Sequence, residues 1–203
     1  MKRNKSWVHR QNNDHYVKSA RKENYRSRAV YKLQEIDEKD RLIRPGMYIL
    51  DLGAAPGGWS QYASKKIKPG GKLIAIDVLE MTEIPGVEFI LGDILDEQTL
   101  HQCITLSGQR QIDLVISDIA PNLTGIRDTD QARSLELAKS VIDVAFQILK
   151  PGGGLLIKLF EGSEIDGFRN ELTSKFQRVM VRKPRASRDS SREIYMLGCG
   201  YEI

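Results

Sequence analysis

ILDLGAAPGGW, residues 49–59, is the stretch of sequence that decides the fold. A short apolar run, typical of a buried strand, stops at Gly53 and leads directly into a helical pattern. In sheets of parallel strands, ligands bind beyond the carboxyl ends of the strands, where glycine lets a ligand approach the backbone closely. We therefore expect this loop, with Gly53 in contact, to bind a cofactor.

Short apolar runs alternate with longer helical patterns on both sides of this loop. Before it, Val30, Leu33 and Ile36 recur at helical spacing, and Ser27 is placed to cap that helix. The alternation predicts an α/β fold with a parallel sheet wrapped by helices. We expect strands at 47–52, 72–77, 87–93, 112–118, 155–160, 178–182 and 193–197, helices at 28–39, 59–67, 133–149 and 166–175, a polar loop at 122–130, and a Ser- and Arg-rich turn at 186–192.

The loop does not match the dinucleotide fingerprint G-x-G-x-x-G, because Ala55 occupies the second glycine position. Pro56 also removes one backbone amide donor, which suits a nucleoside and an amino acid better than a pyrophosphate. A nicotinamide or flavin dinucleotide is therefore disfavoured. The alternative is that the glycines serve only close packing of strand against helix.

Carboxylates stand at the ends of the next two expected strands. Asp77 comes 24 residues after Gly53, near the offset at which an acid reaches ribose hydroxyls in nucleotide-binding sheets. Asp93 ends the following strand, where its carboxylate could accept a hydrogen bond from an adenine amino group. We expect both to bind the cofactor; the alternative is that each caps the helix that follows.

Two further strands place an ionisable group among apolar residues: Asp118 ends IDLVISD and Lys158 lies within LLIKLF. A buried lysine is costly unless an anion holds it or its stem lets the amine reach water. Neighbouring strands lie about 4.8 Å apart. If these two strands are neighbours, Asp118 and Lys158 can therefore meet above the cofactor loop.

The positive charge of the chain is concentrated near its N-terminus. Residues 1–28 contain nine Lys or Arg and two acids, so this segment carries +7 and the remainder −3. A second basic cluster comprises Arg178, Arg182, Lys183, Arg185, Arg188 and Arg192. We interpret 1–27 as a largely irregular, basic RNA-binding arm and 28–203 as one α/β domain. The alternative is that the basic segments only keep the protein soluble.

Several protein classes are disfavoured by composition. Cys103 and Cys199 are isolated, and the three histidines form no metal-ligand spacing, so we expect neither a disulfide scaffold nor a metal site. No apolar run approaches the roughly 20 residues needed to cross a bilayer, and the N-terminus lacks the apolar stretch of a signal peptide. We expect a cytoplasmic protein without membrane contact.

Several motifs, in order along almost the whole chain, resemble the FtsJ-type ribosomal RNA large-subunit methyltransferases. They are YRSRA (25–29), YKL (31–33), DLGAAPGGWSQY (51–62), SDIAPN (117–122), PGGGLLIKLFEG (151–162) and SSREIY (190–195). The resemblance implies a Rossmann-like fold that binds S-adenosylmethionine, with a mostly parallel seven-stranded sheet, an antiparallel last strand inserted between the fifth and sixth, and helices on both faces.

The resemblance also implies the site residues. A catalytic Lys-Asp-Lys-Glu quartet falls on Lys32, Asp118, Lys158 and Glu193, and the implied cofactor contacts are Gly57, Trp59, Asp77, Asp93 and Asp118. Glu193 would lie beside Lys158. In this hypothesis Asp118 and Glu193 position Lys158, which acts on the proton of a 2′-hydroxyl as a general base or by donating a hydrogen bond. Lys32 would hold the target nucleotide or support the network.

The implied reaction is 2′-O-ribose methylation of a uridine in 23S-type large-subunit ribosomal RNA, on the 50S particle, by a monomer. Transfer RNA or a messenger RNA cap is the nearest alternative substrate. Two other classes stay open: a non-catalytic RNA-binding factor that keeps the fold, and a nicotinamide-dependent oxidoreductase. The intact quartet argues against the first. A rise in melting temperature with S-adenosylmethionine or with a dinucleotide distinguishes the second.

Overall fold

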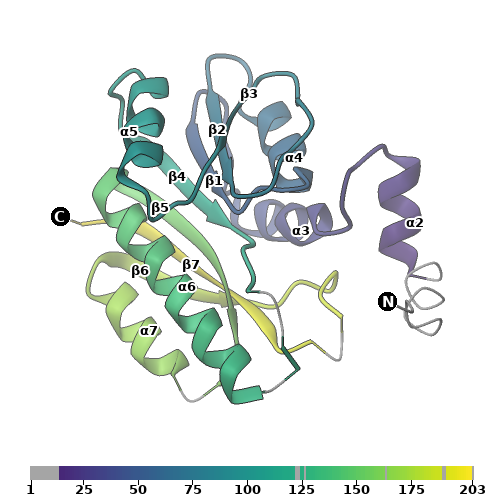
Figure 1. Ribbon diagram of the computed structural model, residues 1–203, viewed down its shortest axis with the longest axis vertical. Helices are drawn as coiled ribbons and strands as arrows, with labels where there is room; N and C mark the ends of the chain where they lie inside the picture. Colours follow the sequence, from purple (N-terminus) through teal and green to yellow (C-terminus); the bar gives the residue numbers. More distant parts are fainter. Residues whose placement is uncertain (1–13, 122–123, 126, 163, 189–190, 203) are drawn as a thin grey trace.

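The computed structural model describes residues 14–202 other than 122, 123, 126, 163, 189 and 190. A seven-stranded sheet forms the centre, in the order β3-β2-β1-β4-β5-β7-β6 (Figure 1). Its strands are β1 (Tyr48–Leu52), β2 (Lys72–Asp77), β3 (Val87–Leu91), β4 (Ile112–Ser117), β5 (Leu149–Phe160), β6 (Phe176–Arg182) and β7 (Glu193–Tyr201). The expected α/β architecture is confirmed.

The last strand runs against its neighbours. The pairs from β3 through β5 are parallel, whereas β7 lies antiparallel between β5 and β6. The beginning of β7 therefore lies at the same edge of the sheet as the ends of the parallel strands: Glu193 is paired with Phe160, and Tyr195 with Lys158. The insertion that the resemblance implied is confirmed.

Helices cover both faces of the sheet, as expected. Helices α3 (Val30–Asp40) and α4 (Gly58–Lys66) bury one apolar cluster with Ile49 and Leu114, and α5 (Glu97–Leu106), α6 (Arg127–Ile148) and α7 (Ile165–Thr173) bury the other with Leu50 and Val115. Ile49 and Leu50 belong to opposite clusters because successive strand residues face opposite sides. Each central strand is thus buried on both faces.

Three helical segments differ from the sequence-based expectation. Helix α5 was not predicted, although Leu100, Cys103 and Ile104 stand at helical spacing and Asp96 caps its start. Helix α6 begins at Arg127, within the expected loop 122–130 and six residues before the expected start. Part of the arm predicted to be irregular forms α2 (His15–Lys22); residues 1–13 of that arm lie outside the described part of the chain.

Helix α2 forms because Asp14 caps it and α3 supports it. The Asp14 carboxylate accepts a hydrogen bond from the Tyr16 backbone N–H, and the rings of Tyr16 and Tyr31 lie 5.4 Å apart. Figure 1 shows α2 standing out from the layered body on the side of α3. Ser27 does not cap α3 itself, which begins later, at Val30; its hydroxyl accepts from the Ala29 N–H in the preceding turn.

Candidate active site

The predicted catalytic residues gather at the carboxyl edge of the sheet. Asp118 directly follows β4, Lys158 lies near the end of β5 and Glu193 begins the antiparallel β7. Lys32 comes from the first turn of α3. Strand order alone therefore brings three of these residues together, and packing of α3 on the sheet adds the fourth.

Lys158 is held by Asp118 through two contacts. Its Nζ lies 3.0 Å from the Asp118 carboxylate oxygen Oδ1 and donates a hydrogen bond of 2.5 Å to the Asp118 backbone carbonyl. The residue is only 8% exposed. The expected meeting of these two side chains is present in the structure, and the burial of the lysine is compensated by an anion.

The ion-pair partner of Glu193 is Lys32, not Lys158. The Lys32 Nζ lies 2.7 Å from Glu193 Oε1 and 3.9 Å from Asp118 Oδ1. Among the described residues, Glu193 forms its ion pair with Lys32 alone. The contacts therefore run from Glu193 to Lys32 to Asp118 to Lys158, and Lys32 is the link between the two acids.

Tyr195 is a further member of this network, and it was not predicted from the sequence. Its hydroxyl donates a 2.6 Å hydrogen bond to Asp118 Oδ1, and its buried ring lies 5.7 Å from that of Trp59. Burial, and then the charges of Asp118 and Glu193, raise the pKa of Tyr195 well above its usual value, so the hydroxyl stays protonated. Alternation along EIYML, which puts Tyr195 on the same face as Glu193, was the signal that could have found it.

The cofactor loop adopts a conformation that requires glycine at two positions. Gly53 has φ +74°, and a Cβ there would lie 2.7 Å from the Ile119 Cβ; Gly57 has φ +101°, and a Cβ there would meet Ile84 and Met81. Positive φ disfavours residues with a Cβ. The tight turn places the backbone of residues 53–57 at the end of β1.

Asp77 fastens this loop to the end of β2. Its carboxylate accepts hydrogen bonds of 2.8 Å from the backbone N–H groups of Ala55 and Leu79. Asp93 is exposed, and its carboxylate accepts from the Leu95 N–H at 3.0 Å. Neither acid is a helix cap, so the capping alternative is wrong: β2 leads to β3 without a helix, and Asp96 caps α5. A carboxylate has about four acceptor positions, so each keeps capacity for a ligand.

A cavity of about 220 Å³ joins the cofactor loop to Asp118. Trp59 forms part of its wall, and the indole Nε1 donates a 2.8 Å hydrogen bond to the Ala29 carbonyl. Gly57, Asp77 and Asp93 are not among the residues around this cavity. It is lined by Ser27, Ala29, Asp51, Gly53, Ala54, Ala55, Pro56, Gly58, Trp59 and Asp118.

Asp51 lies in the wall of this cavity and was not singled out from the sequence. It is 1% exposed, and its carboxylate accepts a 2.6 Å hydrogen bond from the Ser60 hydroxyl. Burial raises its pKa to about 7, and the charges of Asp118 and Asp77 act in the same direction. Its position inside an apolar strand, like that of Lys158, was the available signal.

Arg26 was also missed, and it joins two loops at the edge of the cofactor loop. Its guanidinium donates to the carbonyls of Pro56, Thr82 and Glu83 at 3.2, 2.6 and 2.8 Å. The Arg26 backbone N–H donates to the Gln61 side chain. The arginine therefore holds the segment after β2 against the cofactor loop.

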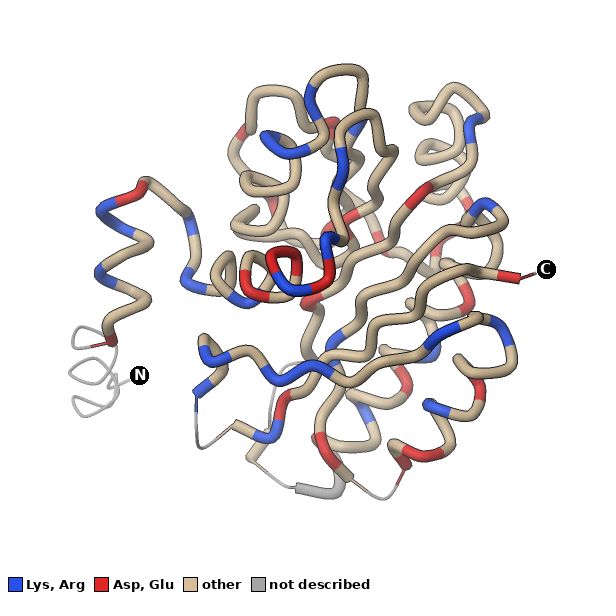
Figure 2. The backbone as a smooth tube through the Cα atoms, turned by 180° about the vertical axis from the view of Figure 1, so that it is seen from behind, with Lys and Arg blue, Asp and Glu red and all other residues tan. Residues whose placement is uncertain are grey.

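Basic residues surround this edge, but several of them hold the structure together. Lys and Arg positions gather on α2 and on the segment after β6 (Figure 2). Arg28 binds Asp14 and the Ala186 carbonyl, and Arg182 binds Asp40 through two hydrogen bonds. The turn expected at 186–192 is anchored at its start, because the Glu35 carboxylate accepts from the Arg185 and Ala186 N–H groups.

Within the described ranges, no group of three or more His, Cys, Asp or Glu could hold a metal ion. In the same part of the chain, no helix has the length and apolar character to span a membrane.

The sequence is closely similar to those of curated bacterial proteins. Over 202 residues it is 49% identical to "Ribosomal RNA large subunit methyltransferase E" of Legionella pneumophila strain Corby, covering 100% of this chain and 98% of that protein. It is 50% identical over 196 residues to the protein of the same name from Pseudomonas fluorescens, covering 97% and 94%.

Solved structures share the fold. A crystal structure of a Plasmodium falciparum protein assigned as a ribosomal RNA methyltransferase matches with a TM-score of 0.79 and 32% identity, over 87% of this chain and 98% of the other. A Streptococcus mutans protein assigned as a methyltransferase, in complex with SAH, matches with a TM-score of 0.51 and 17% identity over 85% and 95%. The family described as "FtsJ-like methyltransferase" matches residues 25–201. The chain therefore belongs to the FtsJ-like methyltransferase family.

Proposed function

We propose that this methyltransferase transfers a methyl group from S-adenosylmethionine to the 2′-hydroxyl of a uridine in large-subunit ribosomal RNA. The observation that carries the proposal is the buried amine of Lys158, held by Asp118 at the carboxyl edge of the sheet beside the cofactor loop. The RNA class comes from the relatives, which are named as ribosomal RNA large subunit methyltransferases and match over nearly their whole length.

The residues around the loop fit S-adenosylmethionine. Gly53 lines the cavity without a side chain, so a ligand can approach its backbone. The Asp51 carboxylate also lines the cavity; among the described residues it accepts a side-chain hydrogen bond from the Ser60 hydroxyl alone, so it suits a cationic amino group. Asp77 keeps acceptor capacity for ribose hydroxyls, and Asp93 for an adenine amino group. We assign Gly53, Gly57, Trp59, Asp77, Asp93 and Asp118 to cofactor binding, and Asp51 with them.

The chemistry needs a hydroxyl aligned with an electrophilic methyl group and the removal of one proton. Bound S-adenosylmethionine supplies that methyl group. Lys158 has three N–H directions, of which Asp118 occupies two through its carbonyl and carboxylate. The third is left for the substrate hydroxyl. Neutral Lys158 takes the proton as a general base, whereas charged Lys158 orients the oxygen by donating a hydrogen bond.

The other charged residues position this amine. Tyr195 and Lys32 contact the Asp118 carboxylate from two further directions, and Glu193 holds Lys32. Because every charge in the group has an opposite partner or a hydrogen-bond donor, the geometry is fixed before the substrate binds. We assign Lys32, Asp118, Lys158 and Glu193 to catalysis and Tyr195 to positioning.

The basic surface around this edge suits a polyanionic substrate. Lys18, Arg21 and Lys22 of α2 lie on the same side of the molecule as α3, which carries Lys32. Phosphate contacts of this kind fix the orientation of an RNA without selecting its sequence. We propose that residues 1–27 contact the RNA, that 28–203 form the catalytic domain, and that the protein acts as a cytoplasmic monomer on the 50S particle.

The test is transfer of labelled methyl groups into large-subunit particles that lack the modification, with naked ribosomal RNA and transfer RNA as parallel substrates. We expect transfer into the particle, and mass mapping should place the methyl group on a uridine ribose. Transfer only into transfer RNA, or into a base instead of a ribose, would overturn the proposal. Capped messenger RNA serves as the fourth substrate.

A further inference from the structure

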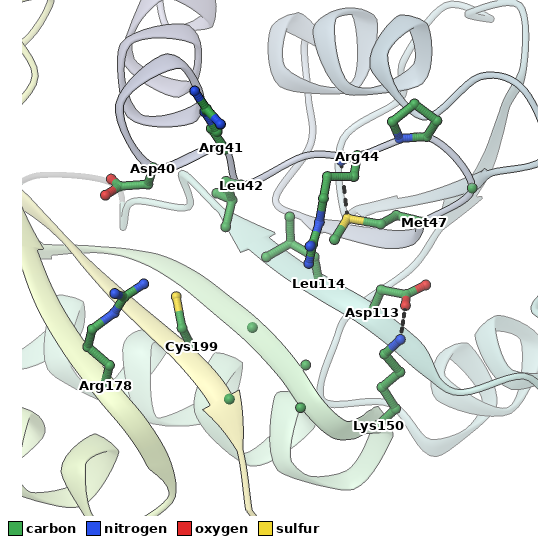
Figure 3. A pocket seen from close by; sticks show the side chains of 16 residues that line it. Asp40, Arg41, Leu42, Arg44, Met47, Asp113, Leu114, Lys150, Arg178 and Cys199 are labelled. Carbon is green, nitrogen blue, oxygen red and sulfur yellow. Dashed lines mark hydrogen bonds and ion pairs between the residues drawn. The ribbon is translucent and has the colours of Figure 1, made fainter.

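A second cavity lies at the edge of the sheet opposite the catalytic residues. It measures about 770 Å³, which is the size of site that holds a nucleotide. Its walls come from the end of α3, the approach to β1 and the beginnings of β4 and β5, with the end of β7 and Arg178 of β6 (Figure 3). The cofactor loop and the catalytic quartet contribute nothing to it.

Three arginines that form no ion pair with a described carboxylate line this cavity. It is lined by Arg41, Arg44, Lys150 and Arg178 and by two carboxylates, Asp40 and Asp113. Both carboxylates are already engaged, because Arg182 binds Asp40 and Lys150 binds Asp113. Among the described residues, no carboxylate forms an ion pair with the three arginines Arg41, Arg44 and Arg178.

The arrangement suits a phosphate-bearing ligand with an apolar part. Figure 3 shows Arg44 and Arg178 on different sides of the cavity, with Leu42 and Leu114 between them and Met47 beside Arg44. Guanidinium groups bind phosphate in a planar, two-pronged geometry, and apolar side chains accept the face of a base. Gly46 and Gly152 have open space where a side chain would stand, so a ligand can approach the backbone there.

The cavity lies within reach of the RNA that would occupy the catalytic site. Gly154 lines the cavity and Lys158 lies four residues further along β5, about 13 Å at 3.3 Å per residue. Four nucleotides cover about this distance at the roughly 3.4 Å rise of a helical strand. On the edge strand β6, Arg178 is paired with Cys199 at the cavity and Arg182 with Tyr195 at the catalytic level, so this strand spans the distance between the two sites.

We propose that this cavity binds a nucleotide of the substrate RNA, about four nucleotides away from the methylated ribose. This inference rests on the proposed function, since it assigns the cavity to the same RNA. The three unpaired arginines bind phosphates, and the apolar side chains of the cavity, Leu42, Met47 and Leu114, contact a base. The contact orients the RNA and takes no part in methyl transfer.

The double variant R44Q/R178Q tests this contact by RNA binding over a range of salt concentrations. The probe is a labelled single-stranded RNA of about 16 nucleotides, within the site sizes of single-strand-binding proteins. The matched control K139Q/R169Q removes two exposed cations from α6 and α7, away from both sites. Melting with and without S-adenosylmethionine shows that each variant folds and keeps its cofactor site.

We expect the double variant to weaken RNA binding about tenfold at low salt and to reduce the slope of log affinity against log salt by about 1.4, or 0.7 for each lost contact. In the methylation assay KM for RNA should rise while kcat stays unchanged. The control should match the parent protein. Equal slopes in the double variant and the control would overturn the proposal.

Uridine monophosphate and inorganic phosphate serve as the second arm. If uridine monophosphate binds to the parent protein, is lost in R44Q/R178Q, and RNA binding is unchanged, the cavity is a site for a free nucleotide and the RNA assignment is wrong. The salt slopes do not depend on methyl transfer. Failure of the particle to accept a methyl group would therefore refute the proposed function while these slopes still decide the role of the cavity.

Discussion

Lys158 is the residue on which the proposed chemistry depends most directly. Replacing it with Ala removes the amine and leaves Asp118 and the cofactor loop in place. We expect kcat for methyl transfer to fall by at least about 10²-fold, within the range that general acid–base groups contribute. Affinity for S-adenosylmethionine, measured by calorimetry, should change little. Lys139→Ala on the exposed face of α6 is the control; near-normal turnover of Lys158→Ala would refute the assignment.

Tyr195 is expected to act through Asp118, and a second tyrosine on β7 provides a matched comparison. Tyr195→Phe removes only the hydroxyl that donates to Asp118, whereas Tyr201→Phe removes one that donates to the Phe146 carbonyl. We expect Tyr195→Phe to lower kcat about tenfold, equivalent to about 1.4 kcal/mol, and to alter its pH dependence. Tyr201→Phe should lower the free energy of unfolding by about 1 kcal/mol and should change neither kcat nor its pH dependence. Equal kinetics of the two variants would show that Tyr195 is merely structural.

Asp51 makes stability depend on pH because burial raises its pKa to about 7. Between the unfolded value near 3.8 and 7, the folded state keeps a proton that the unfolded state has lost. Rising pH therefore favours unfolding through this interval. The stabilisation that protonated Asp51 gives the folded state is fully lost above about pH 7. The amide of Asp51→Asn does not titrate, so this contribution to the pH dependence is absent from the variant.

We expect the stability of Asp51→Asn relative to the parent to improve by roughly 3 kcal/mol between pH 5 and pH 8. Urea unfolding without cofactor at the two pH values measures this difference. Asp143→Asn, on the exposed face of α6, should show no such change. A parent stability that rises between pH 5 and pH 8 relative to Asp51→Asn would contradict the raised pKa.

At the scale of elements, the cofactor loop requires glycine for two reasons: the positive backbone φ angle and the lack of room for a Cβ. Gly53 and Gly70 have similar positive φ values of +74° and +82°, but only Gly53 has a neighbour, Ile119, where a Cβ would stand. Gly70→Ala should cost about 1 kcal/mol from backbone strain alone. Gly53→Ala should cost roughly 1–3 kcal/mol more from overpacking.

Only Gly53→Ala should also weaken binding of S-adenosylmethionine, because Gly53 lines the cavity and Gly70 does not. Thermal unfolding and calorimetric titration of the two variants measure the two effects separately. If Gly53→Ala and Gly70→Ala lose the same stability and bind the cofactor equally, the close approach to Ile119 has no role in the site.

At the scale of the whole molecule, positive charge is divided between structural pairs and free surface. Arg28 and Arg182 each bind an acid from a distant part of the chain, and burial lowers the pKa of Arg28. Exposed cations of α2, by contrast, are free to meet phosphates. The attraction of the surface near the site for RNA is therefore stronger than the net charge of the whole chain indicates.

We predict that the triple change Lys18→Gln, Arg21→Gln and Lys22→Gln lowers RNA affinity and reduces its salt slope by about 2, or 0.7 for each cation. Cofactor affinity should not change. The control replaces Lys139, Arg169 and Lys175, on or near α6 and α7, with glutamine. Fluorescence anisotropy with labelled RNA measures the slopes, and a triple variant that behaves like the control would exclude α2 from the RNA contact.

The sequence by itself determined the order of the strands, the cofactor loop and the central pair. Parallel strands end at one edge of a sheet, so Asp118 and Lys158, each at a strand end, had to be neighbours once β4 and β5 paired. Helix α5 carried a local signal that was not used, because Leu100, Cys103 and Ile104 stand at helical spacing behind the capping Asp96. The early start of α6 carried none, since its first residues, RDTD, are all polar.

Only the tertiary structure decided which partners the charged residues take. Lys32 binds Glu193, Tyr195 binds Asp118 and Asp51 lies in the cavity wall, although these residues are far apart in the sequence. The arginine-lined cavity at the opposite edge likewise combines α3, β5 and β6. A contact between distant segments depends on how helices pack against the sheet and which way side chains turn there, and no local spacing of residues specifies that geometry.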